Sequence, residues 1–117
     1  MSYAYYHFRK GRKLAEDNNF IKAVMHLEKA KKAEPEKASI REALARSYYN
    51  CGFYKPAKEN FQKAVEIDAA NDFAYYGLGM SLAKLGKIHR AIGQLKIAST
   101  MKPQSEEYKN ALRKLGS

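Results

Sequence analysis

The residues of this chain that most often do chemistry in proteins are its three histidines, His7, His26 and His89, and its one cysteine, Cys51. A zinc ion needs several converging nitrogen, sulfur or carboxylate ligands. No cysteine or carboxylate stands at a metal-ligand spacing from these histidines. We therefore expect no metal site, and we expect the histidines to lie on the surface or to be partly packed.

Cys51 has no histidine near it in the sequence, so its expected role is that of a small buried hydrophobe. Gly77-Leu78-Gly79 falls inside a helical pattern, and we interpret it as a site of close packing and not as a phosphate loop. We therefore predict that the chain is not an enzyme and uses no cofactor. A single cysteine excludes an internal disulfide and fits a reducing compartment, so we expect a cytoplasmic protein or a soluble domain of a larger one.

The elements that position these residues follow a period of 34 residues, which carries Ala23 to Ala57 and on to Ala91. The same step relates two further sets of small or apolar residues: Leu27, Phe61 and Leu95, and Ala30, Ala64 and Ala98. A fixed period of this length is typical of a stacked repeat architecture.

Within each unit, apolar residues recur at steps of three and four, which predicts two amphipathic helices. Gly52 and Gly86 separate the two helices of the second and third units, and Asn18 does so in the first. All three can adopt a positive φ and so end a helix. The small residues Gly11, Ala45 and Gly79 are predicted to meet the alanines of the 34-residue series, which would let the paired helices approach closely.

The chain is thus predicted to be one all-α domain over residues 1–117, with units at 4–37, 38–71 and 72–105. Asp72 is expected to cap the first helix of the third unit. Ser105, followed by two glutamates, predicts the start of a last helix over 105–115 that covers the end of the stack.

These residues resemble the tetratricopeptide repeat family over almost the whole chain. The third unit carries the family pattern at Leu78-Gly79, Leu82, Ala91, Leu95, Ala98 and Pro103. The second unit carries it at Leu44-Ala45, Tyr48, Ala57, Phe61 and Ala64, with Ala69 where proline is usual. The first unit departs most, with His7 where a bulky aromatic is common. The resemblance implies an α-solenoid, a right-handed superhelix of three helix-turn-helix repeats with a capping helix.

The resemblance also implies a protein-interaction module whose concave groove, lined by the first helix of each unit, binds a peptide segment of a partner. Such a chain would serve as a scaffold, an adaptor or a chaperone-like protein. The groove positions that the repeat pattern does not require are rich in aromatic side chains and cations, which anchor protein interfaces. The candidate peptide-binding residues are Tyr5, Phe8, Arg9, Arg12, Arg46, Tyr49, Asn50, Phe73, Tyr76, Met80 and Lys84.

Because four of these candidates are cations, we expect the partner to be a protein or peptide with acidic residues. Members of the family that bind chaperones grip a terminal carboxylate of the Hsp70/Hsp90 type with lysine, arginine and asparagine. The corresponding positions here are Phe8, Arg12, Ala43, Phe73 and Gly77. Only Arg12 keeps a cation, so we expect this grip to be absent.

The net charge of +10 arises from 22 lysines and arginines against 12 acids, and it leaves other functions open. A basic surface favours nucleic acid or anionic membranes as well as acidic peptides. The second helices would form such a surface with Lys22, Lys29, Lys32, Lys58, Lys63 and Lys96. We rank nucleic acid below peptide because no aromatic-basic recognition motif accompanies these lysines. Self-association through a repeat end is a further alternative. No apolar run is long enough to span a bilayer.

Overall fold

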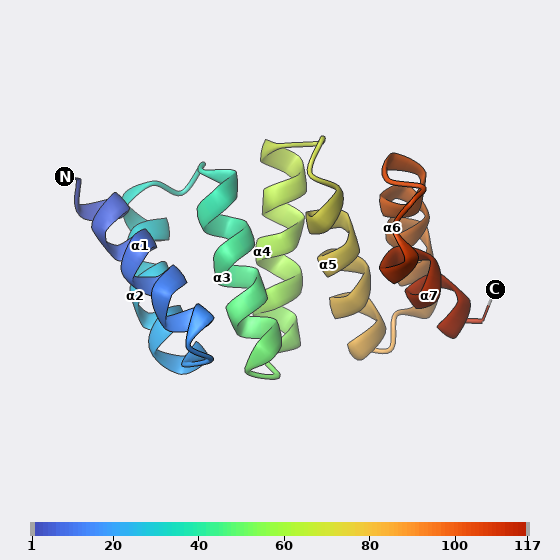
Figure 1. The fold of residues 1–117 in the computed structure, drawn as a ribbon, viewed down its shortest axis with the longest axis horizontal. Helices are drawn as coiled ribbons and strands as arrows, with labels where there is room; N and C mark the ends of the chain where they lie inside the picture. The colour runs from blue at the N-terminus through green and yellow to red at the C-terminus, as the bar shows by residue number, and fades with distance from the viewer. Residues whose placement is uncertain (1, 117) are drawn as a thin grey trace.

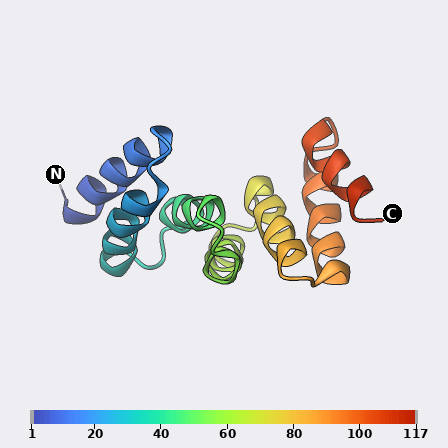
Figure 2. The same ribbon diagram turned by 90° about the horizontal axis from the view of Figure 1, so that it is seen from below.

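The computed structural model describes residues 2–116, so Met1 and Ser117 of the predicted domain lie outside the described residues. The described residues form seven α-helices and no strand: α1 (Tyr3–Glu16), α2 (Phe20–Ala33), α3 (Ala38–Asn50), α4 (Tyr54–Ile67), α5 (Asp72–Lys84), α6 (Ile88–Met101) and α7 (Glu106–Lys114). Three antiparallel helix pairs stand side by side along a molecule of 45 × 25 × 22 Å, with α7 at the C-terminal end (Figure 1; Figure 2). The predicted all-α solenoid is confirmed.

The turns inside the three pairs use the residues that the pattern singled out. Asn18, Gly52 and Gly86 have φ values of 61°, 82° and 80°. Most residues avoid this left-handed region because Cβ approaches the carbonyl oxygen, whereas glycine and asparagine tolerate it. The predicted chain reversals are therefore observed at all three positions.

The expected cap at Asp72 is wrong by one residue. The Asn71 side chain accepts a hydrogen bond from the Ala74 N–H at 3.0 Å, and Asp72 is the first residue of α5. A cap bonds the N–H two or three residues ahead, and the amide of Asn71 meets that spacing. Asp72 is thereby left free to accept a hydrogen bond from α7.

Close approach within the first and third pairs depends on glycine. A Cβ added to Gly11 would lie 2.6 Å from Leu27 Cγ and 3.2 Å from the Ala23 carbonyl oxygen. A Cβ added to Gly79 would lie 2.8 Å from Leu95 Cγ. All three distances are shorter than ordinary van der Waals contacts of a Cβ atom. The 34-residue series of small residues therefore marks helix-helix contacts.

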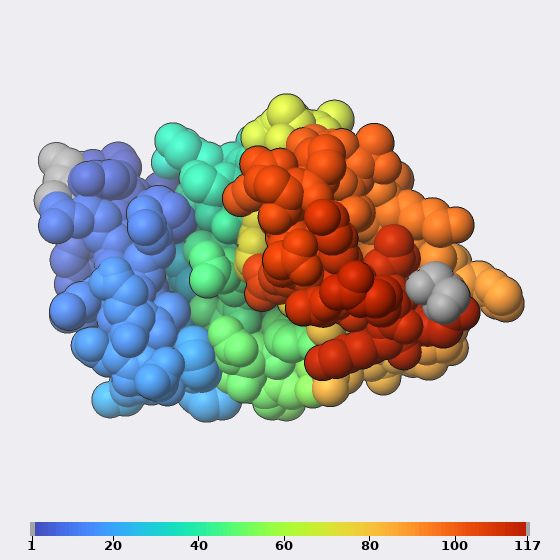
Figure 3. Space-filling model, turned by 45° about the vertical axis from the view of Figure 1, so that its right-hand side comes forward, coloured from blue at the N-terminus to red at the C-terminus, as the bar shows by residue number. Residues whose placement is uncertain are grey.

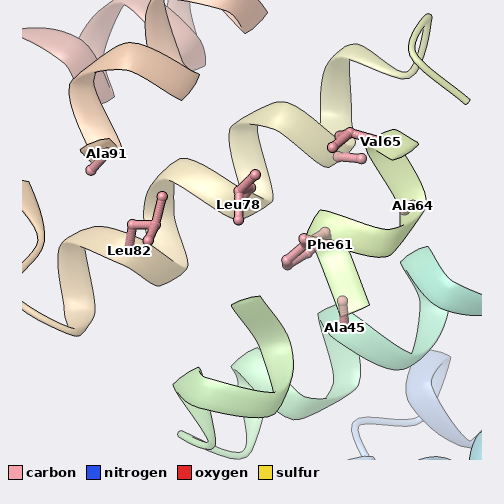
Figure 4. Packing of buried hydrophobic residues seen from close by; sticks show 8 residues of the cluster. Ala45, Phe61, Ala64, Val65, Leu78, Leu82 and Ala91 are labelled. Atoms are coloured by element: carbon pink, nitrogen blue, oxygen red, sulfur yellow. The ribbon is translucent and has the colours of Figure 1, made fainter. Parts of the chain in front are cut away.

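Neighbouring pairs are joined through Phe61, which points from α4 into the space between α3 and α5 (Figure 4). Its ring packs with Ala45 of α3 and with Leu78 of α5, and only 2 % of it is exposed. A Cβ added to Gly77 would lie 2.3 Å from Phe61 Cζ, so the ring lies directly against the backbone of α5. Phe61 therefore fixes the second pair against the third.

The last helix covers the end of the stack, as the sequence predicts (Figure 3). The Ser105 hydroxyl caps α7 by accepting a hydrogen bond from the Tyr108 N–H at 3.2 Å. The ring of Tyr108 stacks on Tyr76 with centroids 4.9 Å apart, and its hydroxyl donates to Asp72 at 2.6 Å. Among residues 2–116, none of the helices is both long and apolar enough to cross a membrane.

Candidate functional site

The first helices of the pairs, α1, α3 and α5, carry all eleven candidate residues, and two hollows lie along them. The first hollow has a volume of about 310 Å³ and lies among α1, α2 and α3. It is lined by Arg12, Ala15, Glu16, Asn18, Phe20, Leu27, Ala43, Arg46, Ser47 and Asn50. Its rim is therefore polar and carries two arginines.

The second hollow has a volume of about 230 Å³ and lies among α3, α4, α5 and α7. It is lined by Arg46, Tyr49, Asn50, Phe61, Phe73, Tyr76, Gly77, Met80 and Glu107. Most of these side chains are aromatic or apolar. The second hollow can therefore accept a bulky apolar side chain, whereas the first suits a polar one.

Arg46 and Asn50 line both hollows and so stand between them. The Arg46 guanidinium lies over the Phe73 ring, 4.9 Å from its centroid. Arg46 Nη1 is also 3.9 Å from a carboxylate oxygen of Glu42, and 57 % of the arginine side chain stays exposed. The Phe73 ring restrains the guanidinium, and more than half of the arginine side chain remains exposed to a ligand.

The aromatic wall of the second hollow is a connected set of rings. The Phe73 centroid is 6.3 Å from that of Phe61 and 5.7 Å from that of Tyr76. Burial and the Glu107 carboxylate raise the pKa of Tyr76 to about 12, and burial with Tyr54 raises the pKa of Tyr49. Both hydroxyls are therefore neutral at physiological pH and can donate hydrogen bonds.

Ser47, at the first hollow, has a buried hydroxyl oxygen without a hydrogen-bond partner among the described residues. Its counterpart one repeat later, Ser81, donates to the Gly77 carbonyl oxygen at 2.8 Å. A buried polar atom without a partner costs free energy, which a ligand group or a water can recover. The Ser47 hydroxyl is thus an unpaired polar group beside the first hollow, and the residue is only 1 % exposed.

Seven of the eleven candidate residues line the two hollows, and the other four lie outside them. The four are Tyr5, Phe8, Arg9 and Lys84. Arg9 lies over Tyr5 at 5.7 Å, and Lys84 lies over Tyr54 at 5.7 Å. Phe8 is half-buried against Leu27 and its neighbours, with Arg12 5.4 Å from its centroid.

Sequence reasoning missed several residues that line the hollows, among them Ser47, Phe61 and Glu107. Ser47 and Phe61 occupy positions of the repeat that normally serve packing, so their periodicity concealed them. Glu107 comes from the capping helix, where its hydrogen bond from the Tyr76 hydroxyl, 3.4 Å, brings α7 to the edge of the second hollow. Nothing in the sequence indicates that a residue in the first turn of the capping helix makes such a contact.

The expectation for the histidines needs correction at His7, which is buried and 8 % exposed. His7 Nδ1 and His26 Nδ1 are 2.9 Å apart, a hydrogen bond between α1 and α2. One repeat later the same two positions hold Arg41 and Asn60, also bonded to each other, at 3.0 Å. The sequence signal for this contact is that His7 and His26 have the same 19-residue separation as Arg41 and Asn60 one repeat later.

The histidine pair and Cys51 stand apart from other metal-binding side chains. Among residues 2–116, no group of three or more histidine, cysteine or acidic side chains is placed to hold a metal ion. Burial raises the pKa of the Cys51 thiol, which lowers its thiolate fraction.

Paired antiparallel helices stacked in one direction define the class of the helical-repeat solenoids. Residues 38–71, which are those of the predicted second unit, match the model of the tetratricopeptide repeat family. Superkiller complex protein 3 of Mus musculus is 31 % identical over 94 residues, which are 80 % of this chain and 6 % of that protein. The chain belongs to the tetratricopeptide repeat family. It spans less than a tenth of the length of the curated relatives it matches, 6 %, 9 % and 7 %.

Solved structures have the same fold. The first TPR of Spaghetti (RPAP3) bound to HSP90 peptide SRMEEVD superposes with a TM-score of 0.91 at 22 % identity, over 96 % of this chain and 89 % of that one. The second TPR domain of human RPAP3, in complex with HSP70 peptide SGPTIEEVD, gives a TM-score of 0.92 at 17 % identity, over 98 % and 96 %.

Proposed function

We propose that this chain is a protein-interaction module that binds a peptide segment of a partner across the two hollows. The observation that carries the proposal is the position of Arg46, which lies between a polar hollow and an aromatic one and keeps more than half of its side chain exposed. The peptides present in two RPAP3 structures of the same fold support this use of the fold.

The preferred partner segment carries at least one acidic residue. Arg12 and Arg46 both line the first hollow, and arginine pairs with a carboxylate through two parallel hydrogen bonds. The net charge of +10 would also attract an acidic segment at long range and so speed its association.

We further propose that the carboxylate grip of the Hsp70/Hsp90 type is absent. Ala43, Phe73 and Gly77 occupy three of the five positions of that grip and line the two hollows. None of them offers a cation or an amide side chain. Recognition of an internal acidic residue, rather than of a chain end, is therefore the function that these residues favour.

The test starts from a peptide selected from a random phage-displayed library on the immobilised protein. Its affinity is then measured for the double variant Arg12→Glu, Arg46→Glu and for the charge-matched control Lys32→Glu, Lys96→Glu, which changes exposed lysines of α2 and α6. We expect binding to be lost in the first variant and retained in the second. Loss only in the lysine variant would favour a basic binding surface on the second helices instead.

A further inference from the structure

The N-terminal end of the stack presents an aromatic cluster that no described element covers. The His7 ring centroid lies 4.4 Å from that of Tyr3, 5.0 Å from that of Tyr6 and 5.2 Å from that of His26. Tyr3 is 59 % and Tyr6 is 48 % exposed. Four rings thus gather on one face, and two of them are open to solvent.

The internal repeat indicates what kind of element fits this face. The positions that follow Tyr6 at steps of 34 residues are Ile40, Ala74 and Tyr108, which are 2 %, 0 % and 3 % exposed. Each of these residues lies in a helix on which the preceding helix of the chain packs: α2 packs on α3, α4 on α5, and α6 on α7. Tyr6 therefore occupies a position that a neighbouring α-helix covers in every later unit.

The charge around the rings restricts the chemistry of such a helix. Lys10 of the first unit is the counterpart of Leu44 and Leu78 in the later units, which are 0 % and 1 % exposed. Lys10 and Lys29 both lie close enough to His26 to lower its pKa, after burial and His7 as the larger causes. A helix that covers the rings would thus meet two ammonium groups and needs acidic residues beside its apolar stripe.

A second copy of this chain does not meet that requirement. Its second helices carry lysines, three of them in α4 and four in α2, against two glutamates in α4 and one in α2. Docking such a helix would set lysine against lysine, which costs free energy. Its C-terminal end is already covered by α7 (Figure 3).

We propose that the end surface, defined as Tyr3, Tyr6, His7, Lys10, His26 and Lys29, binds an amphipathic acidic α-helix of a partner protein. The apolar side chains of that helix pack on the tyrosine rings, and its carboxylates face Lys10 and Lys29. Tyrosines exposed beside cations are the residue types that anchor protein interfaces. This surface is independent of the two hollows and of the peptide proposed to bind there.

The probe for this proposal is a helix-stabilised, fluorescein-labelled peptide that copies α4 (Tyr54–Ile67) with Lys55, Lys58 and Lys63 changed to Glu. It keeps Phe61, Ala64 and Val65, which pack with Ala74 and Leu78 in the native stack. The unaltered α4 sequence is the charge control. Fluorescence anisotropy should show binding of the acidic probe, and binding of the control that is weaker by about tenfold or more.

Two variants place the binding on the end surface. Tyr6→Ala and Lys10→Glu change exposed side chains and should each weaken the acidic probe by about tenfold. Phe53→Ala removes an aromatic ring of similar exposure, 50 %, outside the end surface and should leave the affinity unchanged. Circular dichroism melting confirms that all three variants are folded.

The proposal is overturned if the acidic probe fails to bind, or if Tyr6→Ala and Lys10→Glu bind it like the parent protein. Equal weakening by Phe53→Ala would show that the loss does not depend on the end surface and would also contradict the proposal. Sedimentation of the protein alone should show a monomer. A dimer that Tyr6→Ala dissociates would assign the end surface to a second copy instead.

Discussion

The guanidinium of Arg46 on α3 lies 4.9 Å from the centroid of the Phe73 ring on α5, and this contact joins the second and third repeats at the groove. The ring restrains a side chain that is otherwise exposed. Because a restrained arginine loses less conformational entropy on binding, the contact should contribute to affinity for an acidic peptide more than to stability.

The first prediction concerns the substitution Phe73→Leu, which removes the aromatic ring beneath Arg46 and keeps an apolar side chain. Phe73→Leu should weaken binding of the selected acidic peptide by about two- to fivefold, since a cation–π contact at an exposed site contributes about 0.5–1 kcal/mol. Titration calorimetry measures this change. Tyr5→Leu removes the ring beneath Arg9, outside both hollows, and should leave the affinity unaltered.

The second prediction concerns the approach of α5 to Phe61. Gly77→Ala places a methyl group 2.3 Å from Phe61 Cζ, and overpacking of this kind costs about 1–3 kcal/mol. Gly93→Ala is the matched control, because Gly93 is also helical but has no atom within 4 Å of an added Cβ. Chemical denaturation should show Gly77→Ala destabilised and Gly93→Ala stabilised by up to about 1 kcal/mol. Equal behaviour of the two variants would refute the tight contact.

The third prediction follows from the pairing of His7 with His26. Burial, then His7, Lys29 and Lys10, lower the pKa of His26 below its ordinary value of 6.5. As the pH falls through 6.5, the unfolded chain takes up this proton before the folded chain does. The free energy of unfolding should therefore decrease below about pH 7, whereas above that pH the contribution of neutral His26 is fully retained.

A repeat-derived variant isolates that effect. His7→Arg with His26→Asn installs the pair that Arg41 and Asn60 form one repeat later, and neither replacement titrates between about pH 5 and pH 7.5. Its free energy of unfolding should change less over this range than that of the parent protein. Parallel loss of stability in both proteins would show that the histidine pair is not the source.

The fourth prediction tests the missing carboxylate grip. The peptide SRMEEVD should bind this chain with the same affinity whether its C-terminus is a free carboxylate or an amide. The reason is that Phe8, Ala43, Phe73 and Gly77 occupy four of the five grip positions. Fluorescence anisotropy with both peptides decides the matter, and a clear preference for the free acid would disprove the proposal.

The sequence predicts the fold of this chain well because repetition multiplies a weak local signal. Ala23, Ala57 and Ala91 report the same helix contact three times, so one irregular unit does not hide it. Caps are less well determined, since Asn71 and Asp72 are both good capping residues and only the backbone geometry chooses between them.

The candidate site is harder to predict, because the repeat places helices without placing side-chain ends. Arg46 and Phe73 stand 27 residues apart with no motif that links them. Whether the Ser47 hydroxyl finds a partner, as that of Ser81 does, depends on rotamers and on neighbouring helices. The His7–His26 bond likewise arises from packing between α1 and α2.

Peptide binding across the two hollows is tested most directly by titrating the ¹⁵N-labelled protein with the selected acidic peptide and following the amide chemical shifts. The shifts should concentrate on α1, α3 and α5, with Arg12, Arg46 and Phe73 among the affected residues, and on the start of α7 near Glu107. Shifts confined to the lysine-bearing helices α2, α4 and α6 would contradict peptide binding across the two hollows.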